Sequence, residues 1–137
     1  MPGTAAGTVP LVSARRIPVV LDVGTGVDDA CALLLGALHP GLQLLAVTCV
    51  AGNALEDVVR NTLAVLDTAG RTDVPVAGGA ARPLLEAPRA ARHVHGEDGM
   101  GDLGWRSSSR RPDPRHAVEL LRDVCLTASL QGAPVTL

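Results

Sequence analysis

The chain has 137 residues, which is enough for one domain with a single hydrophobic core. Apolar residues make up 47% of the sequence, but Phe and Tyr are absent and Trp105 is the single aromatic residue. The formal net charge is −2 and the arginines are scattered, so neither a basic face nor stacking aromatics support a nucleic-acid partner.

No segment approaches the ~18 consecutive apolar residues of a membrane span, so we expect no membrane partner either. Residues 1–16 lack the apolar core of a secretory signal, which predicts a flexible leader before a domain at residues 17–137. Cys31, Cys49 and Cys125 form no C-x-x-C pair. We interpret them as reduced, buried cysteines of a cytoplasmic protein.

The first predicted element is a strand that leads into an acidic turn. The apolar segment 17–21 ends at Asp22, and a turn with two glycines then leads to an apolar-periodic helix behind Asp28 and Asp29. Such a unit binds ligands at the carboxyl end of the strand. Two carboxylates at a helix start repel phosphate and suit a hard cation or sugar hydroxyls. The alternative is structural, with Asp28 as the helix N-cap and Asp29 as a favourable first-turn charge.

The elements that follow alternate in type. They are a strand at 42–48, a helix at 55–66, a strand at 74–77, a long loop to about residue 114, a helix from 117 and a strand beginning at 133–137. This order predicts an α/β fold with an open, mostly parallel, doubly wound (Rossmann-like) sheet. Because the last segment resembles a strand that is only beginning, we expect the N-terminal portion of a larger domain, truncated at its C-terminal side.

Three motifs follow one another along the chain. They are the acidic turn from Asp22 to Ala30, then Asn53 after the second strand, and then His93-Val94-His95-Gly96 with Gly99-Met100-Gly101. In this order and spacing they resemble the inosine–uridine-preferring nucleoside hydrolase family. The resemblance implies an N-ribohydrolase, a glycosidase that splits purine or pyrimidine ribonucleosides into base and ribose with the help of calcium.

The resemblance also assigns roles to single residues. It places Asp22 and Asp29 on calcium ligands, and it places Asp28, Asn53 and His95 in the pocket for the ribonucleoside substrate. Cleavage of such a bond passes through a state with positive charge at the sugar, which nearby carboxylates stabilise. A metal-bound water, deprotonated by a carboxylate, can then attack the anomeric carbon.

One motif position departs from the family pattern. The family's second aspartate, a calcium ligand and proposed general base, is Gly24 here, so no catalytic residue is intact. The question whether Asp22 compensates stays open. The family's later calcium aspartate and a histidine would fall beyond Leu137. We therefore expect impaired hydrolysis and weak or absent calcium binding, and the alternative is a truncated, non-catalytic fragment of this family.

Other interpretations remain at this stage. The stretch from Val20 to Gly26 also resembles the first motif of S-adenosylmethionine-dependent methyltransferases, but that motif needs a third glycine where this chain has Asp28. His93 and His95 could form an H-x-H metal pair or lie in a solvated loop. Nucleoside preference and oligomeric state are open, with a homo-oligomer as one alternative.

Overall fold

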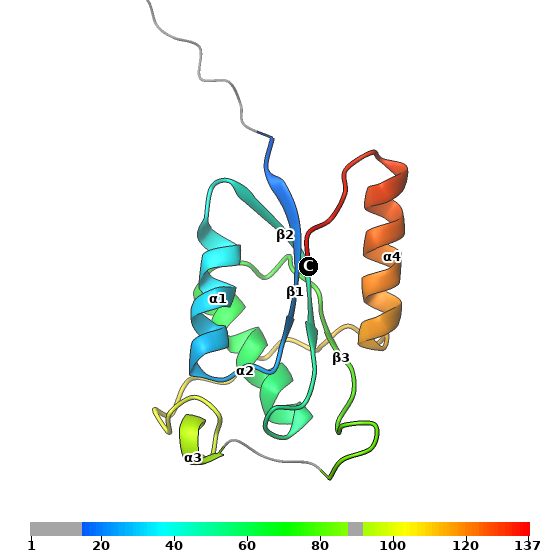
Figure 1. Cartoon of the computed structure of the whole chain (residues 1–137). Helices are drawn as coiled ribbons and strands as arrows, with labels where there is room; N and C mark the ends of the chain where they lie inside the picture. The colour runs from blue at the N-terminus through cyan, green and yellow to red at the C-terminus, as the bar shows by residue number, and fades with distance from the viewer. Residues whose placement is uncertain (1–14, 88–91) are drawn as a thin grey trace, which may run out of the picture.

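The computed structural model describes residues 15–87 and 92–137, so residues 1–14 of the expected leader lie outside the described residues. Its elements, in chain order, are β1 Ile17–Val23, α1 Val27–Leu38, β2 Leu42–Cys49, α2 Leu55–Thr68, β3 Val76–Gly78, α3 Arg92–His95 and α4 Ala117–Leu130. The strands form a parallel sheet in the order β1-β2-β3. The predicted α/β fold with a parallel sheet is confirmed (Figure 1).

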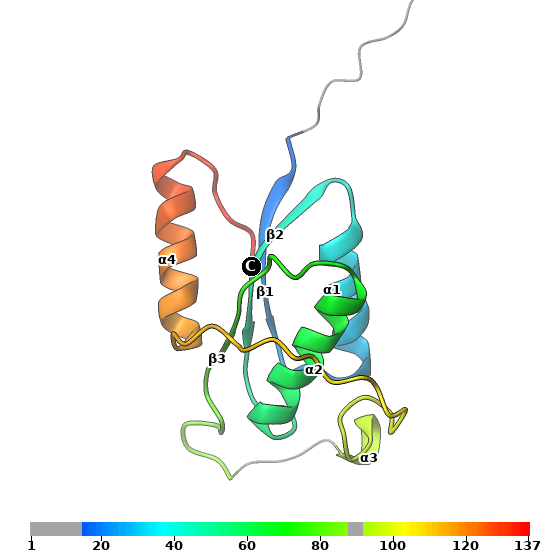
Figure 2. The ribbon, with the colours of Figure 1, turned by 180° about the vertical axis from the view of Figure 1, so that it is seen from behind.

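The helices cover both faces of the sheet. Helices α1 and α2 lie on one face and α4 lies on the other (Figures 1 and 2). Aliphatic side chains such as Leu33, Val47 and Leu66 fill the larger core, while Val20 and Leu120 belong to the smaller core under α4. Burial on both faces explains why β1 and β2 are apolar almost throughout.

The sheet continues on the other side of β1. Thr136 forms a parallel bridge with Val19, the Val20 N–H donates to the Thr136 carbonyl at 3.0 Å, and the Thr136 N–H donates to the Pro18 carbonyl at 2.9 Å. The chain thus leaves β3 at one edge and returns through α4 to the far side of β1. The strand start predicted at 133–137 is present as a single bridge at Thr136.

Two local expectations were wrong. Helix α1 begins at Val27, so Asp28 and Asp29 lie inside its first turn and Gly26 is the N-cap residue. The cysteines were expected to be buried, but Cys31 is exposed because it lies on the side of α1 that faces away from the sheet. In the described part of the chain, no helix is long and apolar enough to cross a membrane.

Candidate functional site

The acidic turn lies where the strand order reverses. β2 pairs with β1 on one side, and the segment around Thr136 pairs with β1 on the other. In doubly wound sheets the carboxyl ends of the strands at such a switch point form the ligand crevice. The turn that follows β1 therefore occupies the position in this fold where a ligand is expected.

The turn after β1 and the turn after β2 touch through two glycines. Val23 pairs with Cys49 at the strand ends, and the Val50 N–H donates to the Val23 carbonyl at 2.9 Å. A Cβ added to Gly52 would lie 3.0 Å from the Gly24 carbonyl oxygen, so this close approach favours glycine at residue 52. A Cβ on Gly24 would have its nearest neighbours at 3.6 Å, which is ordinary contact. The fold therefore has room for a side-chain Cβ at residue 24.

The N-cap residue of helix α1 has no side chain of its own to cap the first N–H groups of the helix. This residue, Gly26, has φ −109° and ψ −163°. Oδ2 of Asp29 accepts the Gly24 N–H at 3.0 Å, which holds this carboxylate against the turn. The Asp28 side chain is 79% exposed. Both carboxylates lie at the positive end of the helix dipole, which stabilises their charge, and they repel an anionic ligand from this end of the helix.

The imidazole of His95 covers the start of α1, although His95 is the last residue of α3 and lies 68 residues after Val27 in the chain. Its Nδ1 accepts the Val27 N–H at 3.4 Å, and its Nε2 lies 3.9 Å from a carboxylate oxygen of Asp28. Because Nδ1 is an acceptor, the neutral ring carries its proton on Nε2, facing Asp28. A Cβ on Gly26 would lie 2.7 Å from Nδ1, so a side chain at residue 26 would displace the ring from this position.

The loop that follows His95 is shaped by Asp98. One carboxylate oxygen of Asp98 accepts the N–H groups of Met100 at 2.7 Å and Asp102 at 3.0 Å. These hydrogen bonds favour the charged form and lower the pKa of the Asp98 carboxyl. The Asp98 carbonyl also accepts the side-chain amide of Asn61 on α2 at 2.8 Å. The loop is thereby fastened to the helix that flanks the site.

Asn53 supplies a buried acceptor beside this loop. It is 8% exposed, and a Cβ added to Gly99 would lie 2.8 Å from its Nδ2. Across residues 15–87 and 92–137, Oδ1 of Asn53 is the one buried side-chain nitrogen or oxygen without a hydrogen-bond partner. A buried polar atom left unpaired costs about 1–3 kcal/mol. A ligand hydroxyl or amine that donates to this oxygen would remove that cost.

The predicted metal ligands do not complete a calcium site. Oδ1 of Asp22 accepts the Thr48 hydroxyl at 2.6 Å, and Asp29 is engaged by the backbone of the turn. Within the described ranges, no group of three or more His, Cys, Asp and Glu side chains is placed to hold a metal ion. Calcium takes about 6–8 oxygen ligands. The residues present therefore do not fit a full calcium site by themselves.

A buried chain of polar side chains anchors the turn from beneath. Oγ1 of Thr25 lies 2.6 Å from Oγ1 of Thr62, which donates to the Val58 carbonyl at 2.8 Å. Because a hydroxyl has one proton, Thr25 must donate to Thr62. The Cys49 thiol lies 3.4 Å from the same oxygen, and burial raises its pKa to about 11, so it stays protonated. The sequence pattern gave no sign of this contact, because Thr25 and Thr62 are 37 residues apart.

The structure brings most of the predicted site residues to one end of the sheet. His95 and Asp28 meet at the start of α1, the Asp29 carboxylate accepts the Gly24 N–H, and Asn53 lies against Gly99 in the loop that follows His95. Asp22 instead binds Thr48 on β2. His93 is exposed, and residues two apart on a helical turn face different directions, so an H-x-H metal pair is not supported.

Comparison with known proteins gives one family. The family model described as inosine-uridine preferring nucleoside hydrolase matches residues 19–137. The inosine-uridine preferring nucleoside hydrolase of Leishmania major is 42% identical over 111 residues, which are 80% of this chain and 35% of that protein. The pyrimidine-specific ribonucleoside hydrolase RihA of Photobacterium profundum is 42% identical over 121 residues, which are 88% of this chain and 38% of that protein.

Solved structures agree with the sequence match. The plant nucleoside hydrolase PpNRh1 superposes with a TM-score of 0.76 at 32% identity, over 81% of this chain and 36% of that one. The purine-preferring ribonucleoside hydrolase from Gardnerella vaginalis gives a TM-score of 0.73 at 29% identity, over 81% and 37% of the two chains. The chain thus spans a little over a third of the length of the relatives it matches.

Proposed function

Since this chain belongs to the inosine-uridine preferring nucleoside hydrolase family, we propose that its activity is hydrolysis of the N-glycosidic bond of ribonucleosides, and that Gly24 impairs this activity. The observation that carries the proposal is the family match over residues 19–137, within which the acidic turn lies at the switch point of the sheet. The same match disfavours an S-adenosylmethionine-dependent methyltransferase.

Each predicted residue has a role in this proposal. Asp28 and Asn53 bind ribose hydroxyls, with the orphan Oδ1 of Asn53 as an acceptor, and His95 lines the pocket above α1. Water attacks the anomeric carbon, the bond to the base nitrogen breaks with its electron pair, and the base takes up a proton. The carboxylates of the turn stabilise the positive charge that develops on the sugar.

The impairment follows from the missing general base. A carboxylate at residue 24 would accept the proton of the attacking water, a contribution of typically ~10²–10⁴-fold in rate, and glycine cannot do so. We also propose that calcium binds weakly, with Asp22 and Asp29 as its ligands. Cytoplasmic location is retained as well, supported by Cys31, Cys49 and Cys125, which are free thiols in the structure.

A release assay tests the proposal. The chain and its Gly24→Asp variant are incubated with inosine or uridine, with calcium or with a chelator, and free ribose is measured as reducing sugar. We expect ribose release to rise at least tenfold in Gly24→Asp, to fall on chelation and to vanish when Asp29→Ala is added. If neither the chain nor its Gly24→Asp variant releases ribose, the proposed hydrolysis is contradicted.

A further inference from the structure

The His95 ring is held only weakly by the helix that it covers. Its Nδ1 lies 3.4 Å from the Val27 nitrogen, which is longer than the usual hydrogen-bond distance of about 2.7–3.2 Å. Its Nε2 lies 3.9 Å from a carboxylate oxygen of the exposed Asp28, and exposed pairs of this kind contribute little. No residue of α3, which ends at His95, is buried. Among the described residues, the short contacts that can fix the ring lie in the segment that follows it.

Residues 95–102 are joined to one another by hydrogen bonds. The Gly101 N–H donates to the His95 carbonyl at 2.7 Å, and the Asp98 carboxylate accepts the N–H groups of Met100 and Asp102. The Asp98 N–H donates in return to the Asp102 carboxylate at 3.2 Å. Because these bonds connect both ends of the segment, a shift of its middle moves the backbone of His95 with it.

The middle of the segment is attached to α2 through Asn61. This side chain is 6% exposed, and its Nδ2 donates to the Asp98 carbonyl at 2.8 Å. A Cβ on Gly99 would lie 3.1 Å from the same Nδ2 and 2.8 Å from Nδ2 of Asn53, so the backbone of the segment passes close to both amides. Met100 is buried in the larger core and adds an apolar contact. The segment therefore has its firm attachment on α2 and not on α1.

We propose that Asn61 is a positioning residue, which sets the place of the His95 ring over the start of α1 by holding the Asp98 carbonyl. The inference rests on the proposed function for the role of His95 in the nucleoside pocket. The contact distances carry it, since a buried hydrogen bond at 2.8 Å stands against exposed contacts at 3.4 Å and 3.9 Å. Loss of the Asn61 amide is therefore expected to displace the ring more than loss of the Asp28 charge.

Nuclear magnetic resonance of the free, isotope-labelled chain tests this order without any ligand. The unaltered chain is expected to show a nuclear Overhauser contact between the His95 ring and the Val27 N–H. We expect Asn61→Ala to reduce its intensity at least twofold and Asp28→Asn to preserve it. Circular dichroism of each variant shows whether the fold is kept.

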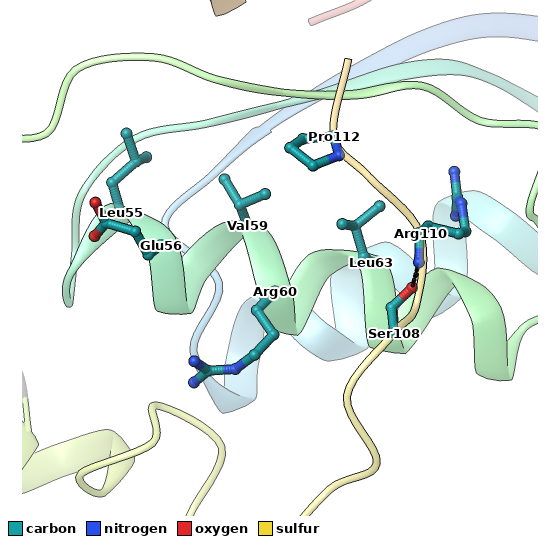
Figure 3. A pocket seen from close by; sticks show the side chains of 8 residues that line it. All are labelled: Leu55, Glu56, Val59, Arg60, Leu63, Ser108, Arg110 and Pro112. Carbon is teal, nitrogen blue, oxygen red and sulfur yellow. Dashed lines mark hydrogen bonds between the residues drawn. The ribbon is translucent and has the colours of Figure 1, made fainter. Parts of the chain in front are cut away.

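The matched control is Glu56→Ala, a change on another side of α2. Glu56 is exposed and lines a separate groove beside the helix, together with Leu55, Val59 and Leu63 (Figure 3). The ring contact is expected to be unchanged in this variant. A reduction equal to that in Asn61→Ala would overturn the proposal, because any disturbance of α2 would then displace the ring.

A second variant acts from the side of the segment. Gly99→Ala places a methyl group against both amides and removes no polar atom from α2, so it serves even if Asn61→Ala fails to fold. Because Gly99 has φ +75°, alanine also strains the backbone there. The same reduction of the ring contact is expected. A contact that persists in Gly99→Ala or in folded Asn61→Ala would overturn the proposal, and so would its loss in Asp28→Asn.

Titration with inosine connects the position of the ring with its proposed role. We expect Asn61→Ala to bind inosine about 2- to 10-fold more weakly than the unaltered chain, the range for one net hydrogen bond. Asn61→Gln keeps an amide donor and is expected to lie between the two. If inosine binds neither the unaltered chain nor any variant, the proposed function is contradicted, while the ring contact still decides the role of Asn61.

Discussion

Thr25 and Thr62 show how single side chains set the position of the acidic turn. Both hydroxyls are buried. The Thr62 hydroxyl accepts a hydrogen bond from the Thr25 hydroxyl and donates one to the Val58 carbonyl. Thr25 belongs to the turn and Thr62 belongs to α2, so the contact ties the ligand edge of the sheet to the helix beneath. Loss of either hydroxyl leaves the other without its buried partner.

We expect Thr62→Val to lower the free energy of unfolding by about 1–3 kcal/mol, because Thr25 then keeps a buried donor with no acceptor. Urea denaturation followed by circular dichroism measures this change. Thr127→Val, a matched change at an exposed position of α4, is expected to stay within about 0.5 kcal/mol of the unaltered chain. An equal effect of both variants would mean that the buried contact contributes nothing.

Gly24 is the residue at which sequence and geometry together are most informative. The motif comparison identifies it as a departure from the family, and the structure adds that a Cβ fits there without a close contact. Glycine at this position is therefore not demanded by the packing around it. Gly52 and Gly26 differ, because Gly52 meets the Gly24 carbonyl and Gly26 meets the His95 ring.

At the scale of elements, the segment between α3 and α4 is fastened by ion pairs that depend on pH. Asp113 accepts two hydrogen bonds from the Arg115 guanidinium, which lowers the pKa of the Asp113 carboxyl to about 2. Arg115 also donates to Asp123 on α4. The Asp113 N–H donates to the Val76 carbonyl of β3 at 2.7 Å, so these contacts together link α4 to that strand.

Because the pKa of Asp113 is lower in the folded chain than its unfolded value of about 3.9, its contribution to stability is present above that value. The contribution is lost as the pH falls from about 4 to about 2. We expect the Asp113→Asn variant to be less stable at neutral pH and to lose less stability over this range. Thermal unfolding at a series of pH values measures both. Parallel pH profiles for the two proteins would contradict this role.

The elements that were predicted well are those with a long apolar period. The helical spacing of Leu55 to Leu66 and of Leu120 to Val124 continues in the structure as α2 and α4. The start of α1 could not be predicted in the same way, because Gly26 and Val27 carry no helix signal. The capping role of His116 was missed as well. Its Nδ1 accepts the Val118 N–H, and its backbone N–H donates to the Glu119 carboxylate, so that it caps α4.

The site was predictable as a set of residues but not as an arrangement. Motif order identified Asp28, Asn53 and His95, yet it could not indicate that the His95 ring would sit on the first turn of α1. It also could not indicate that Oδ1 of Asn53 would be buried without a partner among the described residues. Both facts depend on contacts between distant segments, and these follow from the packing of the loop on α2.

At the scale of the whole molecule, the predicted site residues gather around the switch point of the sheet. The segment around Thr136 pairs with β1 on the side opposite to β2. The acidic turn, Asn53 and His95 lie together at the carboxyl end of the strands.

Nucleoside binding at the switch point is tested by titrating the isotope-labelled chain with inosine and following its amide groups by nuclear magnetic resonance. We expect the side-chain amide of Asn53 and the backbone N–H groups of Gly24 and Val27 to shift together with one affinity. Unchanged signals at saturating inosine would contradict binding at this site, and so would shifts that map to Val59 and Leu63 on α2 instead.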